Sequence, residues 1–216
     1  MTLAVDLSAE MPIIMDQGAR PTCLPCSISD AHQFLYREVP SLSVECLFHG
    51  CVRRDRDALD HGATFEIAKL ALADDGQPEG SEWPYEPMQP ELQTWLDPNP
   101  LAERFKGLIE LTEPTFAAVS GHLIDKRPVV LALRVRDSLI RCGPDGKLES
   151  DCAGVVRGMH AVLAVGLRTN PSQKIKIRNS WGSQWGALGY AEISENYFDA
   201  NVVLAALVNE MEVESV

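Results

Sequence analysis

Residues 174–186 read Lys-Ile-Lys-Ile-Arg-Asn-Ser-Trp-Gly-Ser-Gln-Trp-Gly, a strand pattern that runs into a turn pattern. In the first six residues polar and apolar side chains alternate strictly, which predicts a β-strand with one buried face. Ile175, Ile177 and Asn179 share that face, so the strand ends with a polar amide on its buried side. The glycine after each tryptophan allows a tight turn, because glycine adopts backbone angles that other residues avoid.

Further strand patterns fill the second half of the chain. Residues 160–167, His-Ala-Val-Leu-Ala-Val-Gly-Leu, form a continuous apolar run that is typical of a strand buried on both sides. Residues 127–135 are rich in β-branched and apolar side chains, with a proline near their start. Residues 189–194 supply a further short strand, so the second half predicts a sheet.

The first half shows helical spacing instead. An apolar stripe recurs at intervals of three or four residues and predicts one face of a helix. Its members are Leu24, Ile28, Ala31 and Leu35. A second helix is predicted over 65–75, between a capping threonine and a terminating glycine, and a third over 115–126. A helical half followed by a sheet half predicts an α+β fold with a cleft between two lobes.

Composition limits the partners of this protein. The chain has 216 residues and a formal net charge of −12, which argues against nucleic acid, since phosphate binding needs a basic surface. No apolar run reaches the length of about 18 residues that a membrane span needs, so no membrane partner is expected. The first ten residues lack the basic start of a secretory signal, and we therefore expect a cytoplasmic protein.

Three distant segments combine into a site for thiol chemistry. Residues 16–23 read Asp-Gln-Gly-Ala-Arg-Pro-Thr-Cys and run into the first predicted helix. The positive end of a helix stabilises a thiolate, which favours Cys23 as a nucleophile, and the amide of Gln17 can donate to an oxyanion. His160 begins a buried strand, and neutral histidine is the usual acceptor of a thiol proton. Asn179 can accept a hydrogen bond from the His160 ring.

These segments resemble the papain family of cysteine peptidases, and in particular its minimal bacterial members. The motifs occur in the order of the family, which is Gln–Cys, then His, then Asn-Ser-Trp-Gly. Cys23 follows Gln17 by six residues, as in the family. HAVLAVG (160–166) and IRNSWGSQWGALGYAEI (177–193) are similar to its histidine and asparagine segments. HGATFEIAKLALADDG…EWPYEP is similar to the stretch that shapes the non-primed substrate groove. The resemblance covers about residues 3 to 198.

The resemblance implies a fold of two lobes within one catalytic domain, residues 1–216. One lobe is helical, approximately residues 20–105. The other, formed by residues 1–19 and 106–216, is an antiparallel, β-barrel-like lobe, and the active site lies in the cleft between them.

The resemblance also implies the roles of the site residues. Cys23 is the nucleophile, His160 the base and later the acid, Asn179 the residue that orients His160, and Gln17 the oxyanion donor together with the N–H of Cys23. The expected activity is that of a cysteine endopeptidase that forms a thioester acyl-enzyme and needs no metal or cofactor.

Substrate contacts follow from the same resemblance. Gly62 lies where backbone pairs with an extended substrate, Trp181 shields the site, and Leu133 and Met159 partly line a specificity pocket. The apolar lining predicts an apolar residue two positions before the cut. The partner is a peptide or protein substrate. Gln17 comes too early to leave room for an inhibitory propeptide, so we also expect an inhibitor or regulatory protein.

Three alternatives concern the nucleophile and the reaction. The common family signature ends Cys-x-x-Cys with the second cysteine attacking, which would select Cys26. Cys26 lies nine residues after Gln17, however, and the spacing of six favours Cys23. Leu24 and Pro25 replace the usual pair after the nucleophile, so a catalytically silent binding or regulatory module stays an alternative. Acyl transfer or deamidation through the same residues is another.

The remaining cysteines suggest structural alternatives. Zinc binding would draw on Cys23, Cys26, Cys46, His49 and Cys51, but their spacings fit no common zinc module, and we expect no metal site. Two further cysteines, 142 and 152, flank a turn and could pair across a hairpin. Without an export signal we expect both to be reduced.

Overall fold

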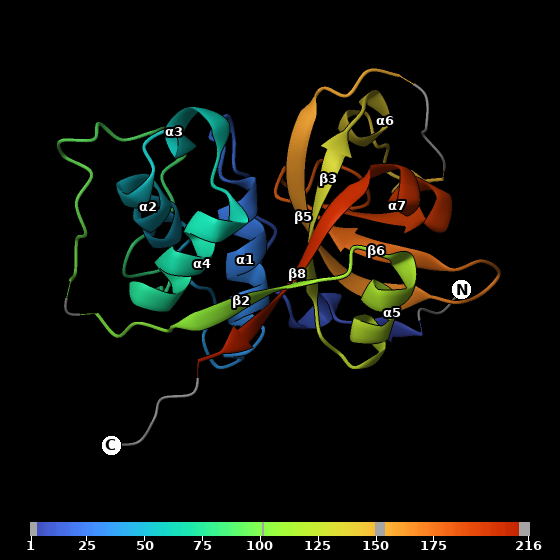
Figure 1. Cartoon of the computed structure of the whole chain (residues 1–216), viewed down its shortest axis with the longest axis horizontal. Helices are drawn as coiled ribbons and strands as arrows, with labels where there is room; N and C mark the ends of the chain where they lie inside the picture. Colours follow the sequence, from blue (N-terminus) through green and yellow to red (C-terminus); the bar gives the residue numbers. More distant parts are fainter. Residues whose placement is uncertain (1–3, 101, 150–153, 212–216) are drawn as a thin grey trace. The chain divides into compact units, whose positions relative to one another are not determined.

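The computed structural model describes residues 4–100, 102–149 and 154–211 and divides the chain into two compact units. Unit 1 comprises residues 1–16 and 111–207, and unit 2 comprises residues 17–110 and 208–216. Figure 1 shows the elements of both units in chain colours. Helices gather in unit 2 and most strands in unit 1, which confirms the predicted α+β class.

Unit 2 is built on helices. They are α1 (Cys23–Gln33), α2 (Val44–Arg54), α3 (Ala58–His61) and α4 (Phe65–Asp74). The predicted cap of α4 is present, because the Thr64 hydroxyl accepts from the N–H of Ile67 and Gly76 adopts a left-handed φ of 66° beyond the helix. α2 was not among the predicted helices; it contacts both α1 and α4 (Figure 1). A Pro-rich loop, residues 84–100, lies between α4 and the next strand of the chain.

Unit 1 is built on a mainly antiparallel sheet. Its strands are β1 (Val5–Asp6), β3 (Val129–Val135), β4 (Lys147–Leu148), β5 (Gly158–Arg168), β6 (Lys174–Arg178) and β7 (Tyr190–Ser194). Two further strands, β2 (Gly107–Thr112) and β8 (Val202–Glu210), cross the boundary between the units. The order is β2-β8-β3-β5-β6-β7-β4, with β1 on β5.

The sheet differs in one respect from the β-barrel-like lobe that we expected. Its path is open, because β2 and β4 form its two ends and do not pair with each other. β4 also pairs with β7 in parallel, whereas the other recorded pairs are antiparallel. The strands predicted from periodicity are present with their bounds shifted by one or two residues.

Helices cover the sheet of unit 1. They are the 3-10 helix η1 (Ser8–Glu10) and the α-helices α5 (Phe116–Ile124), α6 (Asp137–Ile140) and α7 (Glu195–Asn201). α5 and α7 contact each other and also β3, so both lie on the same face of the sheet. The core under them includes Leu131 and Val162, which are fully buried. α5 packs on β5 and α7 on β7. β5 carries the histidine segment, and β6, its neighbour in the sheet, leads into the asparagine segment.

Candidate active site

His160 and Asn179 meet within unit 1. His160 lies in β5 opposite Leu133 of β3, and Asn179 directly follows β6, the neighbour of β5. The Nε2 atom of His160 is 2.7 Å from the Oδ1 atom of Asn179, and both residues are buried. Oδ1 also accepts from the N–H of Ser180 at 2.8 Å. Because Oδ1 only accepts, Nε2 carries the hydrogen and Nδ1 is the basic nitrogen of the neutral ring.

Trp181 packs on this pair. Its ring centroid is 4.4 Å from that of His160, with a tilt of 35°. Trp185 packs edge-on against Trp181 and donates its indole N–H to the carbonyl of Leu139 at 2.8 Å. Trp181 also forms an isolated β-bridge with Asp16. The indoles therefore exclude water from the imidazole and hold its plane.

Burial sets the protonation of the imidazole. Desolvation lowers the pKa of His160 to about 4, and the hydrogen bond to Asn179 opposes that shift. The ring is therefore neutral at neutral pH when no negative charge lies beside it. A neutral, oriented imidazole is the form that accepts a proton from a thiol.

Cys23 is the first residue of α1 in unit 2. Its side chain is half-buried, while Cys26, one turn later, is only 2% exposed. The N–H of Cys26 already bonds to the carbonyl of Thr22 at 2.9 Å, as the helix requires. Cys23 thus combines access with the positive end of an eleven-residue helix. This geometry favours Cys23 over Cys26, in line with the spacing from Gln17.

Gln17 belongs to the same unit as Cys23. It is 6% exposed, and its Nε2 atom donates to the carbonyl of Arg20 at 2.8 Å. An amide nitrogen carries two N–H groups, and this bond uses one of them. The hydroxyl of Tyr85 donates to the carbonyl of Gln17 at 2.9 Å. The predicted oxyanion donor is therefore held at both its side chain and its backbone.

Gly62 adjoins the segment that carries Cys23. It has φ 82°, and a Cβ there would come within 3.0 Å of the carbonyl oxygen of Pro21. Only glycine fits this position without strain. The N–H of Gly62 bonds to the carbonyl of Ala58 at 3.0 Å at the end of α3. The predicted pairing of Gly62 with an extended substrate stays a prediction.

The two residues expected to line a specificity pocket differ. Met159 is 55% exposed beside His160 and offers an apolar contact surface. Leu133 has no exposed surface and belongs to the core of unit 1. It supports His160 from the neighbouring strand, so the expected substrate contact of Leu133 is replaced by a packing role.

Each unit thus holds one part of the predicted constellation. Unit 1 contains His160, Asn179, Trp181 and Met159, and unit 2 contains Cys23, Gln17 and Gly62. The sequence indicated no role for Arg20 or Glu45, and Tyr85 entered only as part of the stretch similar to the one that shapes the non-primed groove. Gln17 bonds to Arg20 and Tyr85, and Glu45 pairs with Arg20.

Three of the described cysteines outside the site have thiol pKa values raised by desolvation. Burial raises the pKa of Cys46 to about 11, that of Cys51 to about 12 and that of Cys142 to about 11. Within residues 4–100, 102–149 and 154–211, no cluster of three or more His, Cys, Asp and Glu could hold a metal ion. Cys152 lies outside the described residues, and so does its suggested pairing with Cys142. No helix in the described part of the chain is long and apolar enough to cross a membrane.

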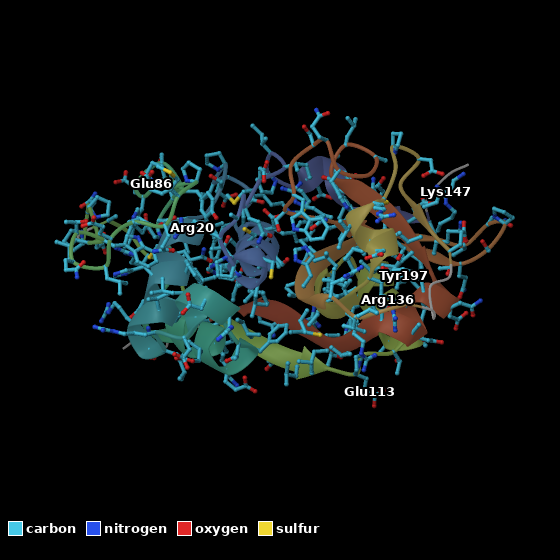
Figure 2. The ribbon with its side chains drawn as sticks, turned by 90° about the horizontal axis from the view of Figure 1, so that it is seen from above. Arg20, Glu86, Glu113, Arg136, Lys147 and Tyr197 are labelled. Atoms are coloured by element: carbon cyan, nitrogen blue, oxygen red, sulfur yellow. The ribbon has the colours of Figure 1, made fainter. Side chains whose placement is uncertain are left out.

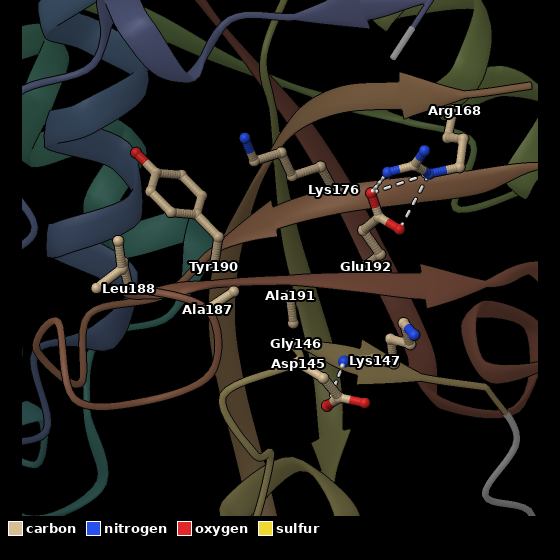
Figure 3. A pocket seen from close by; sticks show the side chains of 10 residues that line it. All are labelled: Asp145, Gly146, Lys147, Arg168, Lys176, Ala187, Leu188, Tyr190, Ala191 and Glu192. Carbon is tan, nitrogen blue, oxygen red and sulfur yellow. Dashed lines mark hydrogen bonds and ion pairs between the residues drawn. The ribbon is translucent and has the colours of Figure 1, made fainter. Parts of the chain in front are cut away.

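A pocket of about 400 Å³ lies on unit 1 and involves none of the predicted site residues (Figure 3). Two of the three cations that line it, Arg168 and Lys176, have anionic partners. Arg168 pairs with Glu192, and Lys176 pairs with Asp6. We assign no binding role to this pocket.

Comparisons with known proteins agree on one family. The family model described as papain family cysteine protease matches residues 25–208, which include His160 and Asn179 and begin two residues after Cys23. Cathepsin Q of Rattus norvegicus is 27% identical over 141 residues, a match that spans 62% of this chain and 40% of the length of cathepsin Q.

Solved structures show the same fold. Xylellain, a cysteine protease from Xylella fastidiosa, superposes with a TM-score of 0.75 at 20% identity over 98% of this chain and 88% of its own. A cysteine protease from Carica candamarcensis, solved in complex with E-64, gives a TM-score of 0.77 at 20% identity over 98% of this chain and 100% of its own.

Proposed function

The chain belongs to the papain family of cysteine proteases, and we propose that it hydrolyses peptide bonds with Cys23 as nucleophile and His160 as general base. The observation that carries this proposal is the buried hydrogen bond between His160 and Asn179 under Trp181. It leaves a neutral imidazole with Nδ1 as its basic atom, which is the half of a thiol–imidazole pair that unit 1 contributes.

Chain connectivity links the two parts of the proposed site. Asp16 pairs with Trp181, which packs on His160. Gln17 follows Asp16 directly, and consecutive Cα atoms are about 3.8 Å apart. The segment that leads to Cys23 therefore starts one peptide bond from the partner of Trp181.

The reaction then follows from these groups. Nδ1 of His160 takes the thiol proton, and the sulfur of Cys23 attacks the substrate carbonyl carbon. Gln17 and the N–H of Cys23 donate to the oxyanion. The C–N bond breaks, the leaving amine takes the proton from His160, and a thioester remains. Water, deprotonated by His160, attacks the thioester carbon, the C–S bond breaks to release the peptide as a carboxylic acid, and His160 returns the proton to the sulfur of Cys23.

For the substrate we propose internal peptide bonds with an apolar residue two positions before the cut. The exposed side chain of Met159, which neighbours His160 in the sequence, is the observation that supports this. We also propose that an inhibitor or regulatory protein controls the enzyme and that it acts in the cytoplasm. Leu24 and Pro25, on which the alternative of a silent module rests, are buried in α1, so we infer that they affect the packing of this helix.

The test compares two cysteines on one helix. Wild type, Cys23→Ala and Cys26→Ala are assayed with a library of fluorogenic peptides and by intact mass after a thiol-directed epoxide. We expect Cys23→Ala to lose hydrolysis by at least about 10³-fold and to lose labelling, while circular dichroism stays unchanged.

Cys26→Ala is the matched control and should keep both activities, apart from a modest loss of stability from a buried position. Loss of labelling in Cys26→Ala alone would reverse the assignment. A wild type that neither cleaves nor is labelled would contradict the peptidase function. Amine-linked products in place of cleaved peptides would indicate acyl transfer.

A further inference from the structure

Arg20 is a buried cation three residues before Cys23. Its side chain is 3% exposed and that of its partner Glu45, on α2, is 0% exposed. The two form a bidentate pair, with Nη1 2.7 Å from Oε2 and Nη2 3.0 Å from Oε1. Removing a charge from water costs on the order of several kcal/mol per ion, so a buried pair needs further contacts that compensate. Such contacts are present around Arg20.

The guanidinium joins the Pro-rich loop to the segment before α1. Nη1 donates to the carbonyl of Glu86, and Nε donates to the side chain of Gln89 at 3.2 Å (Figure 2 labels Arg20 and Glu86). Three aromatic rings surround the cation, with centroids 4.9 to 5.5 Å from its Cζ atom. They belong to Phe48, Tyr85 and Trp95. One side chain therefore connects α2, the loop of residues 84–100 and residues 17–22.

The same residues hold Gln17 and Thr22. Gln17 donates through Nε2 to the carbonyl of Arg20, and the Tyr85 hydroxyl donates to the carbonyl of Gln17. The Tyr85 oxygen is also 2.8 Å from the hydroxyl of Thr22. A phenol has one hydrogen, so Thr22 donates to Tyr85 in this arrangement. Both ends of the segment before Cys23 are thus tied to the ring that lies over Arg20.

We propose that Arg20, Glu45 and Tyr85 form a positioning network that fixes the amide of Gln17 where an oxyanion develops. The proposal rests on the proposed peptidase function. Donors stabilise a transition state only when they are held in place before the charge appears. A loop without regular hydrogen bonds needs side chains to hold it, and here the buried ion pair and its rings perform that role.

The test is a double-mutant cycle with Tyr85→Phe and Gln17→Ala. Losing an oxyanion donor lowers kcat by about 10²–10³-fold. We expect Tyr85→Phe to lower kcat by about 10-fold with little change in KM, because the network acts on the transition state. In a Gln17→Ala background, Tyr85→Phe should lower kcat much less than it does in the wild type, because the amide that the network positions is no longer there. Arg20→Lys, which keeps the charge but loses the bidentate fork, should behave like Tyr85→Phe.

Tyr36→Phe is the matched control, because Tyr36 also lies in unit 2 and its hydroxyl bonds only at the surface, to the carbonyl of Lys106. Alkylation of Cys23 by iodoacetamide forms no oxyanion, so its rate should stay within about two-fold of the wild-type rate in every variant. Additive losses, unchanged kcat in Tyr85→Phe, or alkylation and hydrolysis falling in parallel would overturn the network. A wild type without hydrolysis would instead overturn the proposed function, and this inference with it.

Discussion

Unit 1 and unit 2 hold their site residues by different kinds of contact. In unit 1 the backbone carries His160 and Asn179, since β5 pairs with β3 and β6 in a fixed register. In unit 2 Gln17 lies in a loop that side chains fix, above all the buried pair of Arg20 and Glu45. A strand ladder distributes its support over many backbone bonds, whereas the loop depends on a few side chains gathered around one charge pair. Single substitutions should therefore affect the two units unequally.

The largest effect is expected for Glu45→Gln. The change keeps the shape of the side chain but leaves the buried guanidinium of Arg20 without its counter-charge. Removing one partner of a buried ion pair costs about 3–5 kcal/mol. Urea unfolding measures the loss, and hydrogen exchange read by mass spectrometry should show it in residues 17–110 rather than in the sheet of unit 1. Equal deprotection of both units would contradict the difference between them.

This contrast also explains what the sequence could predict. His160 and Asn179 were found because strand periodicity is local, and a polar residue on a buried face is visible within a few positions of either. The stripe from Leu24 and the cap at Thr64 are local signals too. The partners of Arg20 lie 25 to 69 residues away, and no local pattern indicates that Glu45 faces it. The same holds for Leu133, whose packing role depends on which strand lies beside it.

Acid should lower the free energy of unfolding of both units, by slightly less than Glu45→Gln does. Burial lowers the pKa of His32 in unit 2 and that of His160, the latter to about 4. The folded pKa lies below the unfolded value of about 6.5, so the unfolded chain binds the proton first. Stability is therefore lost as pH falls from about 6.5 to about 4, by at most about 3 kcal/mol for His160.

Urea unfolding at pH 7 and pH 4.5 measures this, in a Cys23→Ala background that removes the nucleophile. His160→Gln and His32→Gln should each reduce the dependence on pH, and the two together should reduce it further. A slope that neither substitution changes would show that these histidines are not the buried neutral groups concerned.

Asn179→Ala tests the backbone-supported half-site. The imidazole loses its bond at Nε2 but keeps the packing of Trp181, so orientation is impaired rather than lost. General acid–base catalysis accelerates a reaction by about 10²–10⁴-fold. We expect Asn179→Ala to lose part of this and to lower kcat/KM by about 10–100-fold. Asn99→Ala, at the surface of unit 2, is the matched control. An Asn179→Ala enzyme with full activity would mean that Trp181 alone orients His160.

The smallest effect is expected for Glu192→Gln, the same substitution as Glu45→Gln applied to unit 1. Glu192 pairs with Arg168 on the sheet surface, with Nε 3.0 and 3.1 Å from its two oxygens (Figure 3). The side chains are 14% and 20% exposed, against 3% and 0% for Arg20 and Glu45. Water still reaches this pair, so breaking it should cost about 1 kcal/mol or less.

Salt provides the sharper readout of this difference. Raising sodium chloride screens a pair that water reaches, so the gap between Glu192→Gln and wild type should narrow at high salt. The deficit of Glu45→Gln should persist, because ions do not enter its surroundings. Both are measured by urea unfolding at low and high salt. If the two substitutions cost the same and respond to salt alike, burial of the charge pair is not what separates the loop of unit 2 from the sheet of unit 1.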